Sequence, residues 1–299
     1  MTEVSAKAKV LAFIWNIILI GLPTMLLSFI SEKSTSAFVL AVMLTSLVVT
    51  LVLLLITYII FRRLGTHNEI GNYLLSVGIA ITIYHVVAAL GVIANMRFGL
   101  SDEAFTFIQP ALILLGCILA IRHYKLNLNL SWRLWEGRQL LRSVVWGILF
   151  GVIFYFLKEP AVSLYSNTLG IIVVYTLLVG VSEELLFRFV VFRLAEKAFG
   201  NRLALWVQAV VFAAMHFIYF NFILRYYSQV GTVLAQTAAL STIIYFLALV
   251  WFGHKCGKLV GVRQNETQWA QGNIVYAIIV HWLTNLVTLA MISFLPRFL

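Results

Sequence analysis

One stretch of the chain indicates both a membrane fold and a site inside it: Ile171-Ile-Val-Val-Tyr-Thr-Leu-Leu-Val-Gly-Val-Ser-Glu-Glu-Leu-Leu-Phe-Arg188. It reads as a membrane helix that carries two adjacent glutamates, and a carboxylate in a membrane costs about 3 kcal/mol on insertion scales. Arg188 follows Glu184 by four residues and can neutralise it on the same helix face. Glu183 is turned by about 100° from Glu184. We therefore expect a Glu184–Arg188 ion pair and a Glu183 carboxylate that is available for chemistry.

The composition places the whole chain in a membrane. Hydrophobic residues make up 62% and charged residues 11% of its 299 residues, and the mean hydropathy is +0.99. Soluble domains are about half apolar and a quarter charged. We predict one membrane domain over 1–299, an all-α polytopic bundle of transmembrane helices. Of the two cysteines, Cys117 falls in an apolar run and Cys256 in an expected basic loop, which does not suggest a disulfide framework.

Nine apolar runs approach the length of about 20 residues that a helix needs to cross a bilayer. They are 10–30, 38–61, 72–95, 104–121, 141–157, 168–190, 203–222, 231–252 and 273–295. The runs 104–121 and 141–157 are the shortest, so eight spans are the alternative to nine. Between these two runs, 126–140 is basic and contains tryptophan, which predicts a helix lying in the membrane interface.

The basic residues orient this arrangement. With nine spans and the N-terminus in the cytoplasm, the loops on the cytoplasmic side carry about three times as many Lys and Arg residues as those on the outer side, as the positive-inside rule requires. The net charge of +10 is thereby explained by topology and by attraction to anionic lipid. No basic face with reading residues is evident, so nucleic acid is not an expected partner.

Two further polar clusters lie in later spans. Phe212-Ala-Ala-Met-His216 and His281-Trp-Leu-Thr-Asn285 each place two side chains four residues apart, on one helix face. A single intramembrane His or Asn more often joins helices than catalyses a reaction. Glu183, His216, His281 and Asn285 nevertheless fall on three different spans, near the middle of each.

Taken together, the three clusters resemble a known family. Glu183-Glu184-x-x-x-Arg188, Phe212-x-x-x-His216 and His281-x-x-x-Asn285 are similar to the motifs of the CAAX endopeptidase and bacteriocin-processing family of intramembrane proteases, which includes the Ras-converting enzymes. The resemblance covers about 165–295, which would be the catalytic core. The N-terminal spans, 1–125, carry no recognised motif.

The resemblance implies a role for each motif residue. Glu183 and His216 would activate a water molecule, and His281 and Asn285 would stabilise the oxyanion. Glu184 and Arg188 would support the architecture, while Phe212 would pack beside the site.

The residue types agree with this chemistry. Hydrolysis of a peptide bond needs a base for water and donors for the developing oxyanion. No serine or cysteine stands near these positions in the setting of a nucleophile, because Ser182 is turned by about 100° from Glu183. Two histidines and a glutamate can also bind zinc, but the H-E-x-x-H spacing does not occur. We therefore expect neither a metal nor another cofactor, with zinc as the competing hypothesis.

The sequence thus predicts a metal-independent, glutamate-type endopeptidase in a bacterial plasma membrane, which it crosses several times. Its substrate would be a membrane-associated peptide or protein, cut near the cytoplasmic face. Whether that substrate is prenylated stays open. The alternative is a non-proteolytic membrane regulator, or a bacteriocin self-immunity protein, that acts by binding a regulatory membrane partner.

Overall fold

The computed structural model shows a bundle of helices, as the composition predicts. It describes residues 6–27, 36–63, 71, 73–74, 77–78, 102–126, 137–158, 169–216, 232–260, 263–265, 268–269 and 274–294. The longer helices are α1 (Ala6–Leu27), α2 (Ser36–Arg63), α4 (Asp102–His123), α5 (Gly137–Lys158), α6 (Leu169–Glu184), α8 (Asn201–Met215), α10 (Thr232–Val260) and α11 (Ile274–Phe294). A π-helix, η2 (Leu185–Val191), and the short α7 (Phe192–Phe199) follow α6. Two short strands, β1 (Arg263–Asn265) and β2 (Gln268–Trp269), form an antiparallel hairpin.

Within these ranges, five helices are long and apolar enough to cross a membrane. They cover Leu40–Ile59, Gly137–Leu157, Gly170–Phe199, Leu240–Val260 and Ile274–Ser293. Three shorter apolar helices accompany them, at Val10–Pro23, Pro110–His123 and Asn201–Met215. An integral membrane protein with several spans follows from this set, while eight or nine spans and a cytoplasmic N-terminus stay predictions.

Several helix bounds differ from the predicted runs. The run 168–190 continues to Phe199, because η2 and α7 extend α6 without a break. The run 203–222 corresponds to α8, which has 15 residues and ends at Met215. The run 231–252 continues to Val260, so Cys256 is buried in α10 and does not lie in a basic loop. Of the runs 72–95 and 126–140, most residues fall outside the described ranges.

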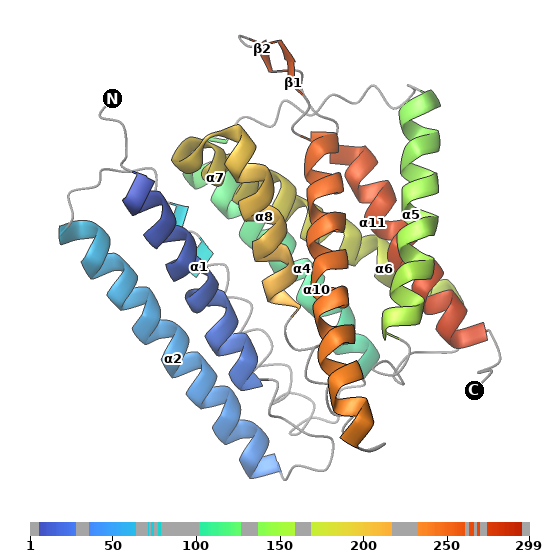
Figure 1. Cartoon of the computed structure of the whole chain (residues 1–299), viewed down its shortest axis with the longest axis horizontal. Coiled ribbons are helices and arrows are strands. Elements are labelled where there is room, and N and C mark those ends of the chain that lie inside the picture. The colour runs from blue at the N-terminus through green and yellow to red at the C-terminus, as the bar shows by residue number, and fades with distance from the viewer. Residues whose placement is uncertain are drawn as a thin grey trace.

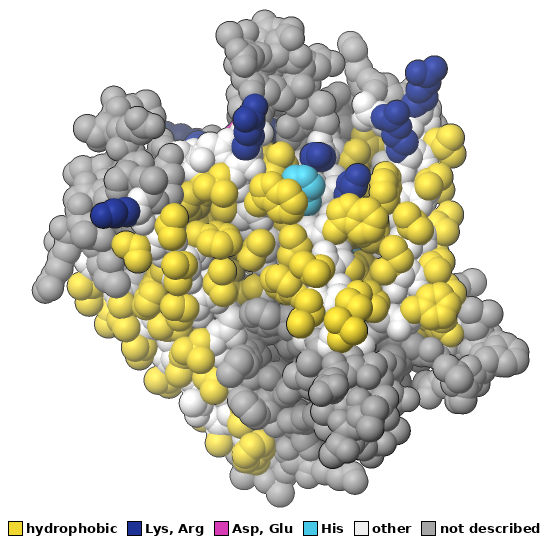
Figure 2. Space-filling model, viewed as in Figure 1, with side chains coloured by type: hydrophobic (Ala, Val, Ile, Leu, Met, Phe, Trp, Pro, Cys, Tyr) yellow, Lys and Arg dark blue, Asp and Glu magenta, His cyan; other side chains and the backbone are white. Residues whose placement is uncertain are grey.

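Figure 1 shows the order of the helices across the bundle. The helices α1 and α2 lie on one side, α5 and α11 lie on the other, and α4, α8 and α10 lie between them. The hairpin and the starts of α1 and α5 lie near one end of the bundle. Figure 2 shows a broad apolar surface, with the described Lys and Arg side chains gathered towards the same end.

Glycines let two helix pairs approach closely. On α5, a Cβ at Gly151 would stand 2.6 Å from the Cβ of Val287 on α11, and the hydroxyl of Thr288 donates a hydrogen bond to the Gly151 carbonyl at 3.0 Å. On α10, a Cβ at Gly253 would stand 3.0 Å from the Cα of Ala209 on α8. Small residues and interhelical hydrogen bonds are the usual means by which membrane helices associate.

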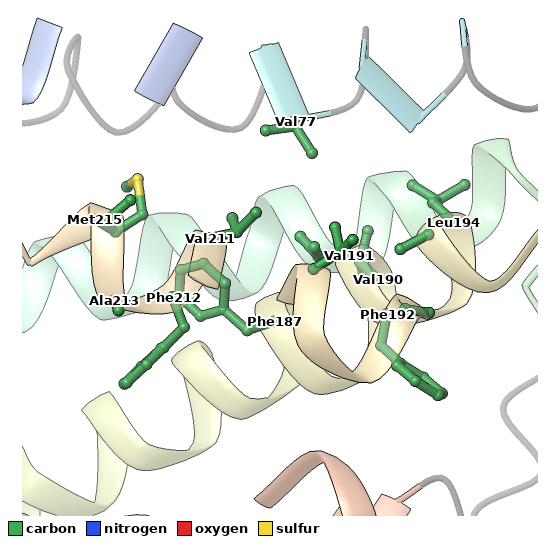
Figure 3. Packing of buried hydrophobic residues seen from close by; sticks show 14 of the residues in the cluster. Val77, Phe187, Val190, Val191, Phe192, Leu194, Val211, Phe212, Ala213 and Met215 are labelled. Carbon is green, nitrogen blue, oxygen red and sulfur yellow. The ribbon is translucent and has the colours of Figure 1, made fainter. Parts of the chain in front are cut away.

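The core is centred on η2, α7 and α8. Phe187 and Phe212 face each other edge to face, with ring centroids 5.2 Å apart, and Val191 and Val211 pack beside them (Figure 3). Val77 approaches this cluster from the opposite side (Figure 3). The glutamate pair stands at the edge of this packed region, at the junction of α6 and η2.

Candidate functional site

The two glutamates stand where the helix changes its hydrogen-bonding pattern. Glu183 and Glu184 are the last residues of α6, and the seven residues of η2 follow directly. The backbone N–H of Phe192 donates to the carbonyl of Phe187, five residues before it. A π-turn of this kind is rare and is often found at functional sites. The wider turn lies directly beside the acidic pair.

Arg188 pairs with Glu184, as the spacing predicts. Its Nε atom lies 3.2 Å from Oε2 of Glu184, and both side chains are fully buried. The atoms are not aligned for a hydrogen bond, so the contact is ionic. The guanidinium group also lies over the ring of Phe212, with its central carbon 4.2 Å from the ring centroid.

Glu184 has a second partner that the sequence did not reveal. Its Oε1 atom lies 2.7 Å from Nδ1 of His281. This hydrogen bond joins α6 to α11 across 97 positions of sequence. Glu184 is therefore the link between the arginine and one of the predicted catalytic histidines.

His281 lies between the two carboxylates. Its Nε2 atom is 3.7 Å from Oε2 of Glu183, while its Nδ1 atom faces Glu184. The His281 side chain is 4% exposed and that of Glu183 is 22% exposed. The less buried of the two glutamates is thus Glu183, to which the sequence assigns the chemistry.

Glu183 and His216 line one cavity of about 80 Å³. This volume holds a few water molecules. Its wall is formed by residues of α4, α6, η2 and α8, and His216 follows the last residue of α8. The lining residues are Pro110, Ile113, Tyr175, Val179, Ser182, Glu183, Leu186, Phe187, Met215 and His216.

A backbone carbonyl orients the His216 ring. Nδ1 of His216 lies 2.8 Å from the carbonyl oxygen of Phe212. A carbonyl only accepts hydrogen bonds, so Nδ1 carries the proton, and in the neutral ring Nε2 is the acceptor nitrogen. A ring fixed in this tautomer is suited to accept a proton from water.

Phe212 contacts several members of the site. Its ring centroid lies 4.6 Å from that of His216 and 5.8 Å from that of His281. Together with the guanidinium of Arg188, these contacts place Phe212 between the two histidines. Phe212 thus contacts both histidines and Arg188, and its role in the site stays a prediction.

The cavity includes Ser182 and does not include Asn285. Asn285 is half-buried on α11, one turn after His281, and its side chain does not line the cavity. Ser182 lines the cavity beside Glu183, although the two residues are turned by about 100° from each other on the helix. Its hydroxyl donates to the carbonyl of Val179 at 3.0 Å, an interaction within its own helix.

In the described ranges, no three His, Cys, Asp or Glu side chains are grouped so that they could hold a metal ion. Zinc stays the competing hypothesis, and removal of metal by a chelator would test it.

One comparison with known proteins gives a match, to a family model over the C-terminal half of the chain. Residues 165–287 match the family model of the type II CAAX prenyl endopeptidases, Rce1-like, which supports the family that the three polar clusters resemble. The match spans all three polar clusters and supports a CAAX-protease-like membrane peptidase. No curated protein and no solved structure matched the chain.

Proposed function

We propose that this protein is a metal-independent intramembrane endopeptidase in which Glu183 activates water. The observation that carries the proposal is the shared cavity: Glu183 and His216 line the same small volume, next to an ion-paired Glu184. A water molecule there would meet a carboxylate and the acceptor nitrogen of a neutral histidine. Such a pair supplies the base that peptide hydrolysis needs.

In the proposed reaction, the water oxygen attacks the peptide carbonyl while its proton passes to Glu183. The C–O bond that forms leaves a negative charge on the former carbonyl oxygen. When the C–N bond breaks, the proton that Glu183 took from the water passes to the departing amine, directly or through His216. The products are a carboxylic acid and a free amine, with no other reactant than water.

His281 is the proposed donor to the oxyanion, with Asn285 as the second. Nδ1 of His281 is engaged by Glu184, so Nε2, on the other side of the ring, is the nitrogen that would donate to the oxyanion.

The substrate class follows from the setting. The cavity lies among membrane helices, so the scissile bond would belong to a membrane-associated peptide or protein. Cleavage near the cytoplasmic face and a bacterial plasma membrane stay part of the proposal.

The experiment compares membrane peptidomes by mass spectrometry from cells that carry the wild type, Glu183→Gln or His216→Ala. Peptides that depend on the wild type should disappear in both variants, while each variant stays folded and at normal abundance. Glu196→Gln is the matched control, because Glu196 pairs with Arg193 outside the site. Cleavage by purified Glu183→Gln at the wild-type rate would refute the assignment.

The same variant distinguishes a purely binding function. If cells that lack the protein lose a measurable trait, the wild type should restore it and Glu183→Gln should not. Restoration by Glu183→Gln would instead support a regulator or immunity protein that acts by binding.

A further inference from the structure

Aromatic rings from three helices meet near the end of the bundle where α5 and α8 begin and α10 ends. Trp146 of α5 and Trp251 of α10 pack edge to face, with centroids 5.5 Å apart. Trp206 of α8 stacks on His254 of α10, with centroids 4.1 Å apart and an angle of 17° between the rings. Trp206 is 50% exposed and Trp251 is 41% exposed. Part of each of these two rings is therefore available to lipid.

A lysine lies over two of these rings. Nζ of Lys255 is 4.4 Å from the ring centroid of Trp146 and 6.0 Å from that of Trp251. Within the described part of the chain, no carboxylate forms an ion pair with Lys255. The aromatic faces thus hold an ammonium group whose charge is not neutralised by a described acid.

Three more cations follow a regular pattern around the rings. Each is exposed, lies four residues from a ring on the same helix, and stands one turn nearer the end of the bundle. The pairs are Arg142 with Trp146, Arg202 with Trp206, and Lys258 with His254. Figure 2 shows the result, a histidine and several basic groups above the apolar surface. We call Lys255, these three cations and the rings of Trp146, Trp206, Trp251 and His254 the basic–aromatic site.

The seam between α8 and α10 fixes this site in place. The side-chain amide of Gln208 donates to the carbonyl of Gly253 at 2.8 Å. A Cβ at Gly257 would stand 2.5 Å from the same amide nitrogen. With a larger residue at Gly257 the Gln208 side chain would have to move, which would disturb its hydrogen bond to the Gly253 carbonyl and the contact between the two helices.

We propose that the basic–aromatic site binds the phosphate headgroup of an anionic phospholipid. Tryptophan rings favour the level of the headgroups, and long basic side chains extend from the apolar region towards the water. Lys255 is the central cation because the rings position it. The apolar surface of the same helices would contact the acyl chains. The basic–aromatic site shares no residue with the lining of the Glu183 cavity, and the proposal does not depend on the proposed peptidase activity.

The test measures thermal unfolding of the purified full-length protein in a non-ionic detergent while phospholipid is added. Phosphatidylglycerol should raise the Tm at lower concentration than phosphatidylcholine. Lys255→Gln should increase the phosphatidylglycerol concentration for half-maximal effect about fivefold, given the attraction of about 1 kcal/mol per basic residue at an anionic surface. Lys255→Gln combined with Arg142→Gln should increase it more than the single change, and Lys255→Arg should stay within about twofold of the wild type.

Arg122→Gln is the matched control, because Arg122 is an exposed cation at the end of α4, on a helix that contributes nothing to the basic–aromatic site. It should change the half-maximal concentration less than Lys255→Gln does. An equal loss in Arg122→Gln would show a general charge effect and overturn the proposal. So would equal stabilisation by both lipids, or stabilisation by inorganic phosphate alone. If Lys255→Gln does not fold, the exposed pair Arg142→Gln and Lys258→Gln takes its place under the same criteria.

Discussion

Replacing Glu184 by alanine should strongly destabilise the protein, because it leaves the buried Arg188 without its ion-pair partner. Both side chains are fully buried, with Nε of Arg188 3.2 Å from Oε2 of Glu184. Removing one partner of a buried pair leaves the other charge uncompensated, which costs about 3–5 kcal/mol in soluble proteins. At about 2–4 °C per kcal/mol for a chain of this size class, the Tm should fall by roughly 6–20 °C in Glu184→Ala, and Arg188→Ala should also fall.

Melting curves in detergent for the wild type, the two single variants and the double variant measure the coupling. The double variant should lose less stability than the sum of the single losses, because it leaves no unpaired arginine. It should still be less stable than the wild type, since His281 loses the carboxylate that lies 2.7 Å from its Nδ1 atom. Losses that add without coupling would contradict the ion pair.

The same measurement separates the two glutamates. Glu183 is partly exposed at the cavity, so Glu183→Gln should melt near the wild-type temperature while it abolishes cleavage. Active-site groups are often a source of strain, and their replacement frequently leaves stability unchanged or raised. If Glu183→Gln unfolds and Glu184→Ala is stable but inactive, the roles of the two residues are interchanged.

Three further outcomes are expected. Phe212→Leu should lower the stability by about 2 kcal/mol in the same melting assay, because it removes the ring under the Arg188 guanidinium; an unchanged Tm would contradict this. Gly151→Ala should cost about 1–3 kcal/mol by overpacking α5 against α11, whereas Gly170→Ala, with no atom within 4 Å of the new methyl group, should be neutral. EDTA should leave cleavage by the purified protein unchanged, and a loss that zinc restores would favour the metal hypothesis.

Part of the site follows from local spacing alone. Glu184 and Arg188 are four residues apart on one helix, and the helix geometry that joins them is independent of the rest of the fold. The contact of Phe212 with His216 has the same origin, since their spacing is also four residues.

Other parts of the site depend on which helices meet. The hydrogen bond between His281 and Glu184 spans 97 positions, and no spacing rule reaches that far. The cavity takes part of its wall from Pro110 and Ile113 of α4, in a region where the sequence showed no motif. Helix rotation alone separates Ser182 from Glu183 by about 100°. Both residues nevertheless line the cavity, because the cavity is wide enough to reach neighbouring faces of one helix.

The sequence by itself determined that the chain is a helical membrane protein and which polar side chains need partners, because transfer of charge into an apolar medium is unfavourable wherever it occurs. It also determined the pairing within a helix turn, because that geometry is local. Only the tertiary structure decided that His281 is held by Glu184, that Glu183 and His216 line the same cavity, and that α6 continues through a π-turn to Phe199. These features arise from helix contacts that are set by packing across the whole bundle, and packing is not encoded in any single stretch of residues.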